Sequence, residues 1–159
     1  MVLSVIILIN TIYMTTHKGK YKIINPQKYK GNHLNIIYRS GWELQTMLFF
    51  DNHPEILWWS SEELFIPYIS PVDNKPHRYF PDFIFSIRDK NGNNKIHMWE
   101  VKPRKQTVMP KRKTKRLNEE IKTYAINQEK WKAAELFCLE KGWKFSIITE
   151  DDLFGKNKG

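Results

Sequence analysis

The sequence predicts an α/β sandwich in which helices flank a mixed central sheet. The predicted elements follow one another as a helix, several short strands, a long helix and a final strand, which is the order such folds require. Hydrophobic residues make up 41% of the 159 positions and include six Trp, seven Tyr and nine Phe, enough for the core of one domain. No repeat or second domain is indicated. We therefore expect a single domain over residues 18–154.

The first helix is predicted over residues 38–52. Ser40 can act as the N-cap and Glu43 follows it three residues later, as in a capping box. His53 and Pro54 then end the helix. Two short strands are expected next, over residues 56–60 and 64–69.

A hairpin is predicted in the middle of the chain. Its strands are residues 78–88 and 95–102, which are rich in aromatic and branched residues, and Asn91 and Gly92 supply the turn. Because side chains alternate along a strand, Glu100 and Lys102 fall on the same face as apolar Ile96 and Met98. Burying an acid and a base there is costly unless they pair with each other or bind something. Together with the nearby Asp82, they form a candidate site.

The longest helical pattern covers residues 115–142, with Gly142 as a natural C-cap. Gln128 interrupts its apolar stripe. It is either a structural glutamine or a helper contact to water, metal or phosphate. A strand over residues 143–149 should follow, and Asp151 and Asp152 are expected to cap a last helical turn.

Residues 1–17 form an N-terminal extension. The apolar run within it is shorter than the ~20 residues that a membrane-spanning helix needs, and its flanks are not those of a signal peptide. Three interpretations remain: an added strand, a tail that docks on a partner, and translated sequence upstream of the true start. We favour the third. Residues 155–159 are expected to fray.

The basic charge is concentrated in one segment. The net charge is +9, and residues 102–116 hold eight Lys or Arg with no acid. Such a cluster favours a polyanionic partner, and DNA is the partner we expect; the alternative is a solvated loop without a partner. The single Cys138 excludes an internal disulfide, and no Cys/His cluster has the spacing of a zinc site. The predicted DNA-binding residues of this segment are Arg104, Lys105, Lys111, Arg112, Lys113, Lys115 and Arg116.

Pro81 and Asp82, followed by Glu100, Val101 and Lys102, match the signature of the PD-(D/E)xK nucleases. The order of residues 38–43, 79–83, 99–103 and 145–153 resembles that of the TnsA-like nucleases. The chain length, the lead-in over residues 29–32 and the basic loop resemble the head completion nucleases of T4-like bacteriophages. The resemblance covers residues 18–153.

This resemblance implies a restriction-endonuclease-like fold. It also implies a deoxyribonuclease that depends on Mg²⁺ or Mn²⁺. The enzyme would be an endonuclease, and additional exonuclease activity is left open. It implies that Asp82, Glu100, Glu43 and the Val101 carbonyl bind the metal, with Glu43, Asp82, Glu100 and Lys102 as the catalytic residues. For Glu43, a capping role and a metal role compete, and the resemblance favours the metal. Lys102 would orient or deprotonate the attacking water, or neutralise charge on the phosphate.

The resemblance further implies action on packaged phage DNA during head completion and head–tail joining. The protein would then work in the host cytoplasm, and its incorporation into the virion is left open. Phage head or portal proteins would be its partners, and no association with a membrane is expected. Two alternatives remain: a transposition, repair or junction nuclease of the same fold, and a DNA-binding assembly protein without catalysis.

Overall fold

The computed structural model describes residues 18–113 and 115–155, so the predicted extension over residues 1–17 lies outside the described residues. At its centre is a sheet with the strand order β3-β6-β7-β8. Strands β3, β6 and β7 pair antiparallel, whereas β8 runs parallel to β7. The predicted α/β class with a mixed central sheet is confirmed. The four strands are Ile56–Ser61, Phe83–Arg88, Asn94–Val101 and Lys144–Ile148.

Strands β6 and β7 form the predicted hairpin, in a register that runs from Phe83 opposite Trp99 to Arg88 opposite Asn94. Gly92 in the turn has φ of 80°, a left-handed conformation that glycine adopts without steric cost. The turn residues therefore account for the position at which the chain reverses.

The predicted strand over residues 78–88 is wrong as a single element, because it divides at Pro81. Strand β5 (Pro76–Tyr79) pairs with β4 (Ile66–Ile69) in a separate two-stranded ribbon, and only β6 joins the central sheet. Proline has no amide hydrogen and cannot continue a ladder of backbone hydrogen bonds. Asp82 thus lies where the chain passes from one sheet to the other.

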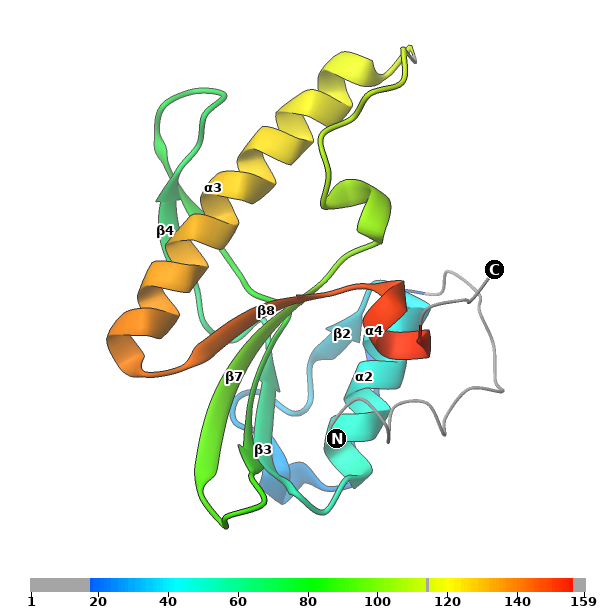
Figure 1. Cartoon of the computed structure of the whole chain (residues 1–159). Coiled ribbons are helices and arrows are strands. Elements are labelled where there is room, and N and C mark those ends of the chain that lie inside the picture. Colours follow the sequence, from blue (N-terminus) through cyan, green and yellow to red (C-terminus); the bar gives the residue numbers. More distant parts are fainter. Residues whose placement is uncertain (1–17, 114, 156–159) are drawn as a thin grey trace.

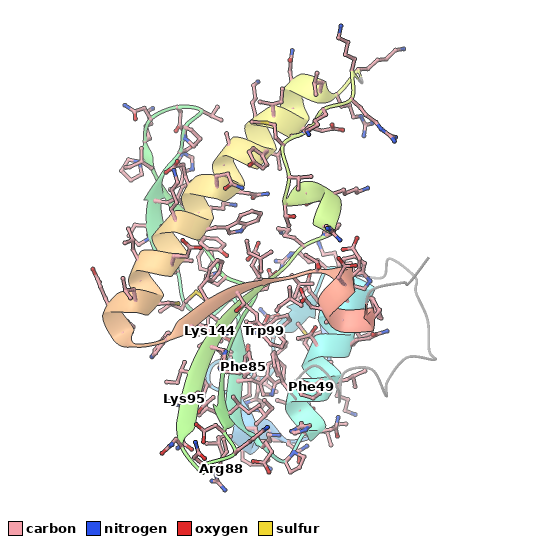
Figure 2. All side chains as sticks on the ribbon, in the orientation of Figure 1. Phe49, Phe85, Arg88, Lys95, Trp99 and Lys144 are labelled. Carbon is pink, nitrogen blue, oxygen red and sulfur yellow. The ribbon has the colours of Figure 1, made fainter. Side chains whose placement is uncertain are left out.

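The two faces of the central sheet carry two hydrophobic clusters. Trp99 and Val101 of β7 pack with residues of α2 (Gly41–Asn52) and α4 (Glu150–Phe154), whereas Met98 packs with residues of α3 (Leu117–Lys141). Figure 1 shows α2 and α4 on one side of the sheet and α3 on the other. In Figure 2, Phe85 and Trp99 fill the space between the sheet and α2, and their ring centroids lie 4.7 Å apart. The predicted alternation along β7 is confirmed.

The helices begin and end close to the predicted positions. Ser40 caps α2 by accepting a hydrogen bond from the Glu43 amide, so the helix starts at Gly41 rather than at residue 38. Gly142 ends α3 with φ of 69°, as the C-cap prediction required. Asp152 completes a capping box with Thr149 at the start of α4. Within residues 18–113 and 115–155, no helix is long and apolar enough to cross a membrane.

A buried aspartate ties the N-terminal part of the described chain to α2. Asp51 is 0% exposed and accepts hydrogen bonds from the Tyr21 hydroxyl at 2.7 Å and from the amides of Ile24 and Asn25 at 2.7 and 2.9 Å. Tyr21 ends strand β1, which pairs with β2. The segment is therefore packed on the body of the protein. Its elements are β1 (Gly19–Tyr21), the short 3-10 helix η2 (Pro26–Lys28) and β2 (Ile36–Tyr38).

We expect Asp51→Ala to lower the free energy of unfolding by about 2–4 kcal/mol, because three donors lose one charged acceptor. Asp51→Asn keeps one acceptor oxygen and should lose less. Urea unfolding measures both changes, and tryptic cleavage at the exposed Lys20 and Lys22 reports whether the segment detaches. An unchanged midpoint and an unchanged cleavage rate would mean that apolar packing alone holds the segment in place.

Candidate active site

The C-terminal end of β7 carries a buried carboxylate. Glu100 is 4% exposed; its Oε2 accepts a hydrogen bond from the Tyr79 hydroxyl at 2.6 Å, and its Oε1 lies 3.0 Å from Nζ of Lys102. Both carboxylate oxygens thus have a partner, which offsets the cost of removing the charge from water. The acid and base expected on one strand face are an ion pair in the structure.

Asp82 lies in the connection between β5 and β6, beside Glu100. Its Oδ2 accepts a hydrogen bond from the Val101 amide at 2.8 Å, which ties the connection to the end of β7. Burial and the negative charge of Glu100 raise the pKa of Asp82 well above its ordinary value, against the opposing effects of Lys102 and the Val101 amide. Two carboxylates that repel each other in this way favour a cation between them.

Tyr79 is a site residue that the sequence reasoning missed. It is 3% exposed, and burial followed by the charge of Glu100 raises the pKa of its hydroxyl. The hydroxyl therefore stays protonated and donates to Glu100. Tyr79 reaches Glu100 because β5 pairs with β4 and packs beneath α3, and this pairing leaves no local signal in the sequence.

Glu43 makes the capping contacts that competed with its predicted metal role. Its Oε2 accepts from the Arg39 amide at 2.8 Å and its Oε1 accepts from the Ser40 hydroxyl at 3.2 Å. Its charge still contributes to the pKa values of Asp82 and Lys102, so it lies near them. Across residues 18–113 and 115–155, no three acidic, His or Cys side chains gather as a metal-binding group. The metal role of Glu43 stays a prediction.

Lys102 is held in its charged form. Burial lowers the pKa of its ammonium, but Glu100, Asp82 and Glu43 outweigh that effect, so that the pKa lies above the ordinary value. A lysine in this state is a poor proton acceptor at neutral pH. Of the roles considered above, orientation of water and neutralisation of negative charge suit it better than deprotonation.

The predicted DNA-binding segment rises from the end of β7 through the 3-10 helix η3 (Arg104–Gln106) and returns as α3, as Figure 1 shows. Arg104 is anchored in this segment: its guanidinium lies 2.6 Å from Asp151, and its amide donates to Glu150 at 2.7 Å. The remaining predicted residues are exposed, so they are available to an anionic partner. These are Lys105, Lys111, Arg112, Lys113, Lys115 and Arg116.

Lys130 brings a polar group of α3 toward the carboxylates. Glu100, Asp82 and Lys102 all influence the pKa of Lys130, which burial lowers overall. Gln128 precedes Lys130 by two residues, which places it about 200° away around the helix. The helper role of Gln128 stays a prediction. Sequence reasoning missed Lys130, although its spacing from the buried Asn127 and Ala134 was an available signal.

The side chains at the end of β7 can bind both a divalent metal ion and an anionic substrate. Two neighbouring carboxylates are oxygen donors of the kind that Mg²⁺ and Mn²⁺ prefer, and the carbonyl of Val101 belongs to the residue whose amide already holds Asp82. The ammonium of Lys102 lies beside them, where it can interact with an anionic substrate. Hydrolysis of a phosphodiester is a reaction that can use both kinds of group.

Comparison with known proteins shows clear similarity. Residues 53–150 match the family model described as TnsA-like endonuclease N terminal, a range that includes Asp82, Glu100 and Lys102 but not Glu43. The chain is 38% identical over 144 residues to the head completion nuclease of Enterobacteria phage T4, and the alignment covers 86% of this chain and 93% of that protein. No solved structure matches the chain.

We expect Lys102→Met to lower the free energy of unfolding by about 1–3 kcal/mol, because it leaves the buried Glu100 carboxylate without its cation. The side-chain stem is retained, so the loss reports the charge rather than the packing. Lys105→Met is the matched control, because Lys105 is exposed on the same segment. Urea unfolding of both variants measures the difference, and equal stability would show that water replaces the ammonium at no cost.

Proposed function

We propose that this chain, which belongs to the family of TnsA-like endonucleases, hydrolyses DNA with a divalent metal bound at Asp82 and Glu100. One observation carries the proposal: the Val101 amide and the end of β7 hold two carboxylates and an ammonium together at the point where two sheets meet. The alternative of a DNA-binding protein without catalysis gives no reason to hold two acids in mutual repulsion.

The residues present fit Mg²⁺ or Mn²⁺. Burial and Glu100 raise the pKa of Asp82 although Lys102 opposes the shift, so a further cation beside the two carboxylates would be stabilised. Asp82, Glu100 and the Val101 carbonyl would hold the ion, and Glu43 would join them on release from its cap. When bound, the ion stabilises negative charge on the phosphoryl group and activates water for attack.

The other groups position these ligands and the DNA. Tyr79 fixes the orientation of Glu100 through its hydroxyl, as outer residues do for metal ligands. Lys102 orients the attacking water or offsets the charge that develops on the phosphate, and it does so as an ammonium. The exposed lysines and arginines between residues 105 and 116 bind the DNA backbone.

The biological role that we propose is cleavage of packaged phage DNA during head completion and head–tail joining. It rests on the name of the relative, the head completion nuclease of phage T4, and on an alignment that covers nearly all of both chains. Phage head or portal proteins would be its partners, in the host cytoplasm or in the virion. A transposition, repair or junction nuclease of the same fold is the second candidate, because the fold does not specify the DNA that is cut.

We expect Asp82→Asn and Glu100→Gln each to abolish cleavage of plasmid and linear DNA in Mg²⁺, because each removes a charged metal ligand but keeps the side-chain shape. The matched control is Glu140→Gln, an exposed acid at the far end of α3 that should leave the rate unchanged. Cutting of closed circular DNA identifies endonuclease activity, and shortening of linear ends alone identifies exonuclease activity.

Full activity in either variant would refute the assignment of the catalytic centre. Loss of activity with EDTA and its return with Mg²⁺ or Mn²⁺ tests the metal separately. Retention of DNA binding by Asp82→Asn would show that the variant is folded and that catalysis, not binding, was lost.

A second expectation concerns the basic segment. Replacing Lys111, Arg112, Lys113 and Lys115 by Ser should flatten the log–log salt dependence of DNA binding by about 0.9 for each phosphate that the protein no longer neutralises. Turnover at saturating DNA should change much less, because these groups bind the ground state and the transition state alike. Fluorescence anisotropy across a salt series measures the slope, and an unchanged slope would mean that the segment is only solvated.

A further inference from the structure

Lys130 is unlike the other lysines of α3. It lies on the side of the helix that carries the buried residues Asn127, Ala134 and Cys138, whereas Lys132 and Lys122 are exposed and pair with acids of their own helix. Lys130 is half-buried. A lysine ammonium is strongly hydrated in water, so its position against the body of the protein carries a cost that needs a compensating contact.

Two tyrosine rings supply part of that compensation. Nζ of Lys130 lies 5.8 Å from the ring centroid of Tyr68 and 5.6 Å from that of Tyr79. Both distances lie near the ~6 Å limit of a cation–π contact, so these two contacts are weak. Within residues 18–113 and 115–155, Lys130 takes part in no ion pair. Its ammonium therefore lacks a strong anionic partner in this part of the protein.

The surroundings of Lys130 indicate which anion its ammonium could bind. Tyr79, over whose ring Lys130 lies, donates its hydroxyl to Glu100, so the ammonium is one side chain away from the catalytic carboxylate. Glu100 and Asp82 raise the pKa of Lys130 and Lys102 lowers it, although burial has the largest effect and lowers it overall. The two ammonium groups thus lie close enough to interact, one from the end of β7 and the other from α3.

The arrangement of the elements agrees with the proximity of Lys102 and Lys130. In Figure 1 the chain leaves the end of β7, rises through η3 and returns as α3, which passes over the sheet on the side of the β4–β5 ribbon. Lys102 therefore approaches the carboxylates from the strand, and Lys130 approaches from the returning helix. A DNA strand bound at Asp82 and Glu100 would meet a cation from each.

We propose that Lys130 binds a phosphate of the DNA backbone next to the scissile phosphate, as a second cationic contact of the active site. The proposal rests on the function proposed above, in which DNA is cut at Asp82 and Glu100. The competing interpretation is structural: the ammonium serves only to pack α3 against Tyr68 and Tyr79. The two interpretations differ in whether the effect of Lys130 depends on the charge of one particular phosphate.

The test uses the full chain and short duplexes whose cleavage position is first mapped with the wild-type protein. Each further duplex carries one neutral methylphosphonate at a successive position around that point. Single-turnover cleavage is measured for wild type, Lys130→Met, Lys130→Arg and the matched control Lys132→Met, which removes an exposed lysine two residues away. Thermal unfolding of each variant reports whether it is folded.

We expect Lys130→Met to slow cleavage of unmodified DNA roughly 10- to 100-fold, the usual effect of removing a charged hydrogen-bond donor. Neutralising one phosphate should slow the wild type by a similar factor but leave Lys130→Met unaffected, because methionine carries no charge with which that phosphate could pair. Lys130→Arg should retain most of the rate and the sensitivity to that phosphate. Lys132→Met should behave as wild type at every position.

If the effects of Lys130→Met and of the neutral phosphate multiply at every position, the lysine has only a structural role and the inference is overturned. Wild-type rates in Lys130→Met would overturn it as well. Both outcomes are distinct from a failure of the proposed function, in which the wild type itself would cut none of the duplexes. If Lys130→Met does not fold, Lys130→Gln takes its place on the same duplexes, because glutamine is also neutral and keeps a polar end.

Discussion

The buried carboxylate of Glu100 is the constraint on which the candidate site depends. It is paired with Lys102 and hydrogen-bonded by Tyr79, and without these two partners an ionised acid could not remain at the end of a central strand. Each partner comes from a different element, because Lys102 follows β7 and Tyr79 ends β5. The position of one charge therefore requires that the ribbon, the sheet and the covering helix α3 pack correctly around it.

Pro81 explains how the second carboxylate arrives at the same place. It lies in the connection between β5 and β6 and prevents one continuous strand there, so that Asp82 lies at the junction of two sheets and not inside a ladder. At this junction the side chain can accept the Val101 amide of a neighbouring strand. A continuous strand over the same residues would have held the Asp82 backbone in a ladder of its own. The proline of the motif therefore has a role in the topology of the chain, besides being the sequence neighbour of Asp82.

Much of this architecture could be predicted from local patterns. Alternation along β7 placed Glu100 and Lys102 on one face, Asn91 and Gly92 located the hairpin turn, and Gly142 located the end of the long helix. What could not be predicted depends on pairing between distant segments. Tyr79 reaches Glu100 only because β5 pairs with β4, and Lys130 reaches the site only because α3 crosses that ribbon. Glu43 is a case in which two local patterns compete. Its capping contacts form in the structure, whereas the motif assigns it to the neighbouring metal site.

The anchoring of Arg104 has a consequence for the proposed binding of DNA by the basic segment. Its guanidinium and amide are held by Asp151 and Glu150, in the acidic first turn of α4, and the other end of the basic segment continues into α3. The segment is therefore a closed loop with both ends fixed, not a free tail. A tethered loop has fewer conformations to lose when it is ordered by a ligand, so less of its electrostatic attraction is cancelled by entropy. For the proposed binding of DNA, the acids of α4 therefore act in two ways: they reduce its entropic cost, and their charge opposes it.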